Sequence, residues 1–253
     1  MAIGFNFRLI FCSWIVIACS NLNSWAEDQI FLKKGDPVKG EIQEIKDGKV
    51  LVKLAAGTIP YPLDTIERVI MEERPSYHEG ADAAASGDEN KAIKILKPLV
   101  DKYIGLEVGW VADAAVYLAE SYAKKGKTFK AEQLAEQILS LYRGSEYEVQ
   151  GNVVTARLAF VKGDLEKAAI LTEKLIQENT PKDEPIPDES KTRLLSSLTF
   201  QRAQIQEKKG QKADALESYL KVALIYSKPQ SRAQAAQKRA DLLRKDNKDL
   251  TVN

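Results

Sequence analysis

The 253-residue chain has almost none of the side chains that form covalent cross-links or bind transition metals. Its two cysteines, Cys12 and Cys19, lie near the amino terminus, and His78 is its single histidine. One histidine cannot build a metal cluster, so we expect neither a metal nor another cofactor. If residues 1–26 are removed, the remaining chain has no disulfide and must be stabilised by packing alone.

The sequence also lacks the short motifs that carry familiar catalytic chemistry. It has no glycine-rich phosphate loop, no G-x-S-x-G elbow and no His-Glu-x-x-His pair. Carboxylates are numerous, as on any soluble helical surface, but none stands in a spacing that indicates an acid–base pair. We therefore expect that the protein is not an enzyme.

Neither sign of charge dominates, since 37 lysines and arginines face 36 acidic residues and the formal net charge is +1. A nearly neutral chain lacks the basic surface that attracts nucleic-acid phosphates, so we expect no nucleic-acid partner. Hydrophobic residues make up 44% of the chain, which indicates a folded protein. Basic residues are denser from Ser227 to Asn253, and a solvated helix face explains this as well as a binding patch does.

The apolar run near the amino terminus, Leu9 to Ser20, has 12 residues. A membrane-spanning helix needs roughly 20 residues, so a permanent anchor is disfavoured. Arg8 precedes the run, and Ser24-Trp25-Ala26 follows it with the small-x-small pattern of a cleavage site. We therefore predict that residues 1–26 form a signal peptide, that cleavage follows Ala26, and that the mature protein is exported.

A second processing route uses Cys19. The stretch Val16-Ile17-Ala18-Cys19 resembles the bacterial lipobox, in which the cysteine becomes the lipidated first residue of the mature protein. This route would attach the protein to a membrane, in the periplasm or at the outer membrane. We expect the folded part to begin near Asp28, which favours cleavage after Ala26 without a tether, but both routes stay open.

Residues 27–72 follow the period of two that is typical of β-strands. Short strands are separated by turn residues, among them Asp47-Gly48, a pair favoured in tight hairpins. Gly40 indicates a bend or bulge, and Pro60 and Pro62 restrict their strand to an edge. The segment therefore predicts a small, bent, partly open barrel of five short strands.

The segment contains the pattern Phe31-Leu32-Lys33-x-Gly35, Gly40-x-Ile42, Val50-x-Val52, Ile59-Pro60 and Ile66-x-Arg68-Val69. This pattern resembles the small SH3-like or Sm-like modules of bacterial envelope proteins. The resemblance implies a docking or oligomerisation unit, and a domain that only caps the following helices is the alternative.

Residues 77–245 contain one pattern four times: a glycine followed five residues later by an alanine. The successive glycines stand 39, 37 and 47 residues apart, in the range of stacked helical repeats. Glycine permits the positive φ of a turn, and alanine lets two antiparallel helices approach closely. The four pairs are Gly87 and Ala92, Gly126 and Ala131, Gly163 and Ala168, and Gly210 and Ala215.

These positions resemble the tetratricopeptide repeat, most clearly in the unit that contains Leu118, Ala119, Tyr122, Gly126 and Ala131. The resemblance implies a mainly α fold, in which about four helical hairpins form a solenoid. We expect a capping helix from Gln230 to Lys245 and a disordered tail over 246–253. The glycine spacings exceed the family's usual 34 residues, so longer helices or loops are expected.

The longest spacing contains the acidic segment Asn179 to Ser190, with three prolines and four acidic residues. Prolines exclude a helix through most of it. A solvated linker accounts for the segment, and a flap over one face of the helices is the functional alternative.

The resemblance to tetratricopeptide proteins of the bacterial envelope implies a binding groove lined by the first helix of each unit. Such a groove suits an extended peptide or a helix of a partner protein. Carried over position by position, it is lined by Tyr77, Ala81, Asp113, Val116, Glu120, Val153, Arg157, Phe160, Phe200, Gln204 and Glu207. Phe160 and Phe200 are alternatively plain core residues.

We therefore expect a non-catalytic adaptor that holds protein partners in the cell envelope. Two other functions fit the same sequence. One is a structural oligomer assembled through the β module, and the other is an envelope protein that binds peptidoglycan or another carbohydrate.

Overall fold

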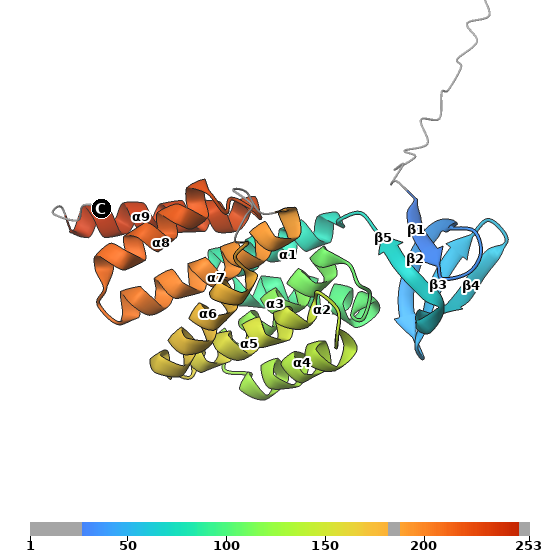
Figure 1. Ribbon diagram of the computed structural model, residues 1–253, viewed down its shortest axis with the longest axis horizontal. Helices are drawn as coiled ribbons and strands as arrows, with labels where there is room; N and C mark the ends of the chain where they lie inside the picture. Colours follow the sequence, from blue (N-terminus) through green and yellow to red (C-terminus); the bar gives the residue numbers. More distant parts are fainter. Residues whose placement is uncertain (1–26, 182–187, 248–253) are drawn as a thin grey trace, which may run out of the picture.

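The computed structural model describes residues 27–181 and 188–247. The predicted signal peptide with Cys19, residues 182–187 of the acidic segment and residues 248–253 of the predicted tail lie outside the described residues. Within the described part, a small antiparallel sheet of five strands precedes nine α-helices (Figure 1). The predicted class, mainly α with a small amino-terminal β unit, is confirmed. The finer descriptions, a tetratricopeptide solenoid and an SH3-like barrel, stay predictions.

The sheet has the spatial order β4-β3-β2-β1-β5, with β4 at one end and β5 at the other. Asp47 and Gly48 turn β2 into β3 with φ angles of 51° and 71°, as their sequence predicts. A short 3-10 helix, Leu63–Thr65, links β4 to β5. The strands are β1 (Asp28–Leu32), β2 (Val38–Lys46), β3 (Lys49–Leu54), β4 (Gly57–Pro62) and β5 (Ile66–Ile70).

The predicted bulge at Gly40 is wrong. Gly40 pairs regularly with Asp28, and the register of β2 against β3 shifts between Ile42 and Glu44. A Cβ atom at position 40 would lie 2.5 Å from Leu54 Cδ2. Glycine is needed here because the side chains of β3 approach the backbone closely.

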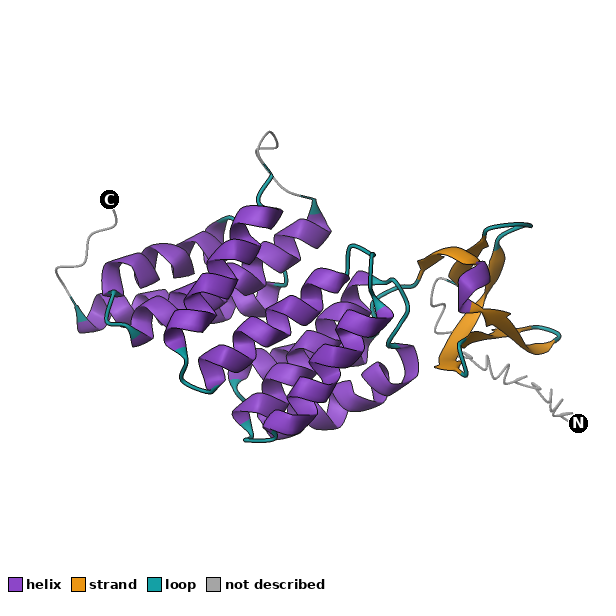
Figure 2. Cartoon of the chain, turned by 60° about the horizontal axis from the view of Figure 1, so that its bottom comes forward, coloured by secondary structure: helices purple, strands orange, loops and turns teal. Residues whose placement is uncertain are grey.

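The helices follow one another as antiparallel neighbours, and each helix contacts the next along the chain. Contacts between α1 and α3, α3 and α5, α5 and α7, and α7 and α9 place the odd-numbered helices in one continuous layer. Figure 2 shows the helices packed together, with the small sheet at one end of them. The helices are α1 (Pro75–Ser86), α2 (Glu89–Tyr103), α3 (Gly109–Lys124), α4 (Thr128–Leu141), α5 (Glu148–Val161), α6 (Leu165–Asn179), α7 (Glu189–Lys208), α8 (Lys212–Leu224) and α9 (Gln230–Asp246).

The four predicted glycine–alanine pairs lie where two helices of a hairpin meet. Each glycine has a positive φ, between 71° and 84°, which an L side chain adopts only with strain. Each alanine is fully buried near the start of the second helix. Asp88 and Asp164 add helix caps, since their carboxylates accept the backbone N–H of Lys91 and Lys167.

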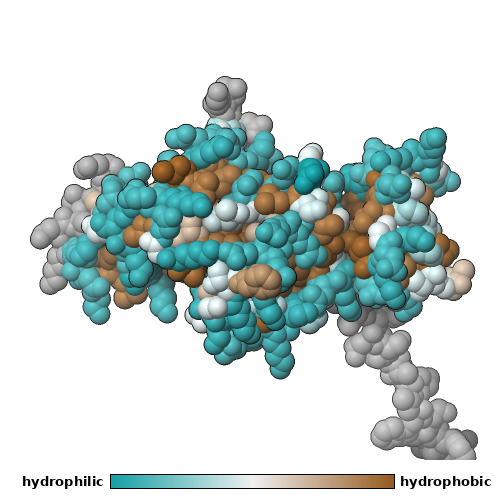
Figure 3. All heavy atoms as spheres, turned by 90° about the horizontal axis from the view of Figure 1, so that it is seen from below, coloured by the Kyte–Doolittle hydropathy of each residue, from teal (hydrophilic) through white to brown (hydrophobic). Residues whose placement is uncertain are grey.

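The sheet and the helices are joined by direct contacts and a short connection. Pro75 is the first residue of α1, so only residues 71–74 connect β5 to the helices. The Arg74 guanidinium lies 2.6 Å from the Asp28 carboxylate, and Trp110 Nε1 donates to the Met71 carbonyl at 3.2 Å. Apolar side chains gather where the sheet meets the helices, as the view from below shows (Figure 3).

The last helix returns to the first. Helix α9 begins after Pro229, as predicted, and packs its apolar side on α8. It also contacts α1, although most of the chain lies between them (Figure 1). The layer of odd-numbered helices is therefore curved, with its two ends in contact.

Candidate partner-binding cleft

The middle of the predicted groove is occupied by the protein's own side chains. Arg157 of α5 lies between α3 and α7, with Nε 3.4 Å from a carboxylate oxygen of Glu120 and Nη1 donating to Gln204 Oε1 at 2.6 Å. Lys124 pairs with the same carboxylate at 3.0 Å. The Arg157 and Glu120 side chains are only 3% and 10% exposed, so their charges hold helices together and do not face a partner.

The electrostatics of this group keep its members ionised. Burial alone would raise the pKa of Glu120, but Arg157, Lys124 and Arg232 together outweigh it and lower that pKa to about 2. Burial lowers the pKa of the Arg157 guanidinium, and the nearby Glu120 carboxylate opposes this. An arginine stays protonated at neutral pH after such a decrease, so the pair is a buried salt bridge.

A second charged group joins α1, α3 and α7 to Glu73, which lies in the connection between β5 and α1. Arg193 of α7 has Nη1 3.9 Å from the Asp113 carboxylate and 3.3 Å from the Tyr77 hydroxyl, and it also pairs with Glu73. Burial raises the pKa of Asp113 to about 6, although Arg232 and Arg193 oppose the increase. The Arg232 guanidinium also lies 4.8 Å from the centre of the Tyr117 ring, within the range of a cation–π contact.

The predicted groove residues therefore fall into two sets. Those on α1 and α3, with Val153 and Arg157 of α5, are buried or nearly so, and pack or form ion pairs inside the helical layer: Tyr77, Ala81, Asp113, Val116, Glu120, Val153 and Arg157. Those toward the carboxyl end line an open cleft: Phe160, Phe200, Gln204 and Glu207. The second set is the part of the prediction that can meet a partner in this structure.

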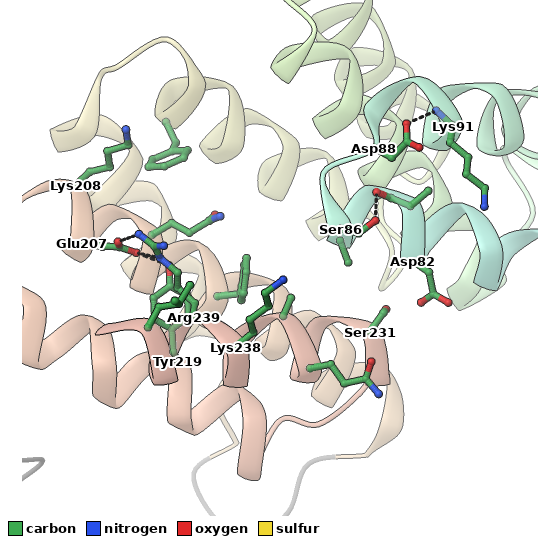
Figure 4. A pocket seen from close by; sticks show the side chains of 18 of the residues that line it. Asp82, Ser86, Asp88, Lys91, Glu207, Lys208, Tyr219, Ser231, Lys238 and Arg239 are labelled. Atoms are coloured by element: carbon green, nitrogen blue, oxygen red, sulfur yellow. Dashed lines mark hydrogen bonds and ion pairs between the residues drawn. The ribbon is translucent and has the colours of Figure 1, made fainter. Parts of the chain in front are cut away.

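The cleft has a volume of about 1130 Å³ and is lined by α1, α2, α5, α7, α8 and α9 (Figure 4). Its floor is apolar and aromatic. Phe200 packs edge-on against Tyr219, with ring centres 5.5 Å apart, and Phe160 is half-buried beside them. Leu242 of α9 is 39% exposed at its side. An apolar floor of this size can receive side chains of another molecule.

The two walls of the cleft carry opposite charge. On the side of α1 and α2, Glu79 pairs with Lys91 at 3.0 Å, and Asp88 caps α2. Asp82 on the same wall is exposed and has no ion-pair partner among the described residues. This wall is acidic, with three carboxylates and one ammonium group lining the cleft.

The opposite wall, on α7 and α9, is basic. Arg239 binds Glu207 with two hydrogen bonds, one of them 2.9 Å long, and Tyr219 also donates to Glu207 at 3.0 Å. Lys208 and Lys238 are exposed, and the described part of the chain offers neither an ion-pair partner. Figure 4 shows Lys238 on α9 and Asp82 on α1 at opposite sides of the cleft.

The basic wall was missed in the sequence. The sequence predicts only a capping role for the last helix, but its return to α1 makes residues such as Lys238, Arg239 and Leu242 part of the cleft. The basic density from Ser227 to Asn253 was the available indication. A solvated helix face explains these basic residues equally well, and neither explanation places them opposite α1.

Comparisons with known proteins assign no function to this cleft. No protein-family model and no curated protein matches the chain. It is similar to a solved structure named MamA AMB-1 P212121, with 18% sequence identity, 68% of this chain and 99% of that chain covered, and a TM-score of 0.32. Similarity at this level carries no argument about fold or function.

Two properties of the described residues bear on other kinds of site. In residues 27–181 and 188–247, no helix is long and apolar enough to cross a membrane. The same residues contain no group of three or more histidine, cysteine, aspartate or glutamate side chains that could hold a metal ion.

Proposed function

We propose that the protein is a non-catalytic scaffold that holds a segment of a protein partner in the cleft between α1 and α9. The observation that carries this proposal is an open cleft with an aromatic floor between walls of opposite charge. We further propose that it acts in a bacterial cell envelope after export, as the sequence of residues 1–26 indicates.

The cleft favours a partner segment of defined chemistry. An apolar side chain would lie on Phe160 and Phe200, where it would remove aromatic surface from water. Acidic residues would face Lys208 and Lys238, whose charges are not neutralised within the described chain. Residues toward the other end of the segment would be neutral or basic, since they would face Asp82.

Selection from a displayed library of random 12-residue peptides tests this function. Immobilised protein is expected to enrich peptides that combine an apolar side chain with acidic residues at one end. The double variant Lys208→Glu, Lys238→Glu should bind these peptides at least about tenfold more weakly, because two attractions become repulsions. Enrichment of basic peptides, or of none, would contradict the proposal.

The matched control changes the same charge elsewhere. Lys94→Glu with Lys167→Glu replaces two exposed lysines of α2 and α6 that do not line the cleft. This control should leave peptide affinity unchanged at physiological salt, where charges more than about 8 Å away are screened. An equal loss in both double variants would show that only net charge matters.

Export is proposed from the sequence alone and has a direct test. The mass of the protein isolated from its native cells identifies the processing route. A chain that begins at Glu27 supports cleavage after Ala26, and a lipidated chain that begins at Cys19 supports membrane attachment. A chain that still begins at Met1 contradicts both.

A second function, assembly through the β module, is favoured by one observation. Strands β4 and β5 end the sheet, and each carries a partly exposed isoleucine, Ile59 at 39% and Ile70 at 44%. Unpaired edges of this kind can pair with another copy. Light scattering of the mature chain tests the idea: a dimer that Ile59→Lys or Ile70→Lys converts to a monomer supports it, and a monomer without substitution contradicts it.

A further inference from the structure

A second cavity lies where the sheet meets the helices. Its volume is about 600 Å³, and it is lined by the start of β1, by β2 and β3, and by Arg74 and Tyr103 of the helical part. Glu27, Asp28 and Glu41 bring three carboxylates to it. Lys39 and Lys53 also line it, and Lys53 pairs with Glu41 at 3.6 Å in an exposed position.

The cavity contains an incompletely bonded buried carboxylate. Asp28 is only 3% exposed, and its Oδ2 accepts the Ile42 backbone N–H at 2.9 Å and Arg74 Nη2 at 2.6 Å. Its other oxygen, Oδ1, is buried and has no hydrogen-bond partner in the described part of the chain. A buried acceptor without a donor is unfavourable, and more so when it is charged, so a missing donor is indicated.

Burial also raises the pKa of the Asp28 carboxyl, and the Ile42 N–H and Arg74 only partly oppose this increase. The carboxylate therefore needs further positive charge to be stabilised in its ionised form. A primary ammonium group meets both needs, because it carries three N–H donors and a positive charge.

We infer that this cavity binds a primary ammonium group at Asp28 Oδ1, and that the group is the chain's own α-ammonium at Glu27. The inference depends on the proposed cleavage after Ala26. Hydrolysis of the Ala26–Glu27 peptide bond consumes one water and leaves a carboxylate on Ala26 and an amine on Glu27, which takes up a proton at neutral pH. Glu27 precedes Asp28 directly and lines the same cavity, so the new ammonium group forms one residue away from the unpartnered oxygen.

This contact would couple processing to the junction between the two parts of the protein. Asp28 already joins β1 to Arg74, which directly precedes α1, and Tyr103 at the end of α2 borders the same cavity. An ammonium group on Oδ1 completes the bonding of this carboxylate. The junction therefore reaches its most stable form in the processed chain.

Chemical reactivity of the α-amine tests the inference in purified protein. The chain that begins at Glu27 is released from an amino-terminal fusion without extra residues and treated with limiting acetic anhydride at pH 8. We expect its α-amine to acetylate at least about tenfold more slowly than that of a chain that retains Ala26, because a paired ammonium holds its proton and only the free amine reacts. Equal rates in the two chains, which share every residue from Glu27 onward, would overturn the inference.

Two variants identify the carboxylate. Asp28→Asn in the Glu27 chain should restore the fast rate, and Glu67→Gln, which changes an exposed acid of β5 outside the cavity, should leave the slow rate unchanged. If Asp28→Asn fails to fold, the comparison with the Ala26-retaining chain still decides. A slow rate that persists in folded Asp28→Asn overturns the assignment to Asp28.

The source of the ammonium group is tested with ethylammonium chloride. The Ile42 amide resonance is followed because its N–H bonds the same carboxylate. A saturable shift in the Ala26-retaining chain that is absent from the Glu27 chain supports an occupied site in the latter. An equal saturable shift in both chains would overturn the assignment to the chain's own terminus. Because all these proteins are prepared in vitro, the result does not depend on where cells cut the chain or on whether the cleft binds a partner.

Discussion

Arg157 and Glu120 form a buried ion pair between α5 and α3, with 3.4 Å between the guanidinium Nε and the carboxylate. Both residues were predicted to face a partner. Their burial shows that the centre of the curved helical layer is closed by internal charges, and that the accessible surface lies nearer the contact between α1 and α9.

Arg157→Met should destabilise the fold strongly. Methionine fills similar space but leaves the buried Glu120 carboxylate without its nearest counter-charge on α5, so we expect a loss of about 3–5 kcal/mol of unfolding free energy. Urea denaturation measures this loss. Lys162→Met is the matched control, since Lys162 and Glu132 form an exposed pair, and it should cost less than about 1 kcal/mol. Equal costs would show that burial does not strengthen the Arg157 pair.

Asp113 should make the fold more stable as the pH falls from 7 toward 4.5. Its folded-state pKa of about 6 lies above the ordinary value of 3.8, so protonation favours the folded state and ionisation above pH 6 opposes it. The increase should approach about 1.4 kcal/mol per pH unit within this window. The contribution of Glu120 to stability changes with pH in the opposite direction. Its pKa is lowered in the folded state, so its ionised form stabilises the fold, and this stabilisation is lost only as the pH falls below the ordinary pKa of 4.5.

The test compares Asp113 with Asp113→Asn by urea denaturation between pH 7 and 4.5. Both chains carry His78→Gln, so that the imidazole which pairs with Glu73 does not contribute. Asparagine resembles the protonated acid, and Arg193, Arg232, Glu73 and Tyr77 remain around it. We expect the variant to be more stable at pH 7 and the difference to shrink by pH 4.5. A pH-independent difference would contradict the elevated pKa of Asp113.

Gly163 should tolerate asparagine better than valine. Its φ of 84° lies in the left-handed region, and a Cβ atom there would meet nothing within 4 Å, so strain and not crowding decides the effect. Valine should cost roughly 1–2 kcal/mol or more, and asparagine, which visits this region, distinctly less. Thermal unfolding of the two variants measures the difference. Similar losses would show that the turn does not require a positive φ.

Much of the fold could be predicted because local rules determine it. The Asp47-Gly48 hairpin and the turn glycines each require a backbone conformation that few other residues adopt, so single positions located these turns. The bulge between Ile42 and Glu44 could not be placed from the sequence. Gly40 pointed to the wrong position, because this glycine makes room for Leu54 of the neighbouring strand, and a contact between strands leaves no local pattern.

The candidate site could be predicted only in part. Phe160 and Phe200 follow from the repeat pattern, and the structure places them in the cleft. Asp113 and Arg157 belong to the same predicted groove but are buried or nearly so, since α7 and α9 supply Arg193 and Arg232 to the same interior. The curvature that brings α9 to α1 arises from the sum of many helix contacts, which no single motif records.

The most direct test of the account is photo-crosslinking from the cleft in cells that make the protein naturally. A benzophenone amino acid replaces Leu242, which is 39% exposed in the cleft, or Phe129, which is 69% exposed on α4 outside it. We predict a discrete protein adduct from position 242 that is absent at 129, is lost with Lys208→Glu and Lys238→Glu, and persists with Lys94→Glu and Lys167→Glu. The same adducts from both positions, or an adduct at 242 that survives reversal of the cleft lysines, would contradict the cleft as the site of partner binding.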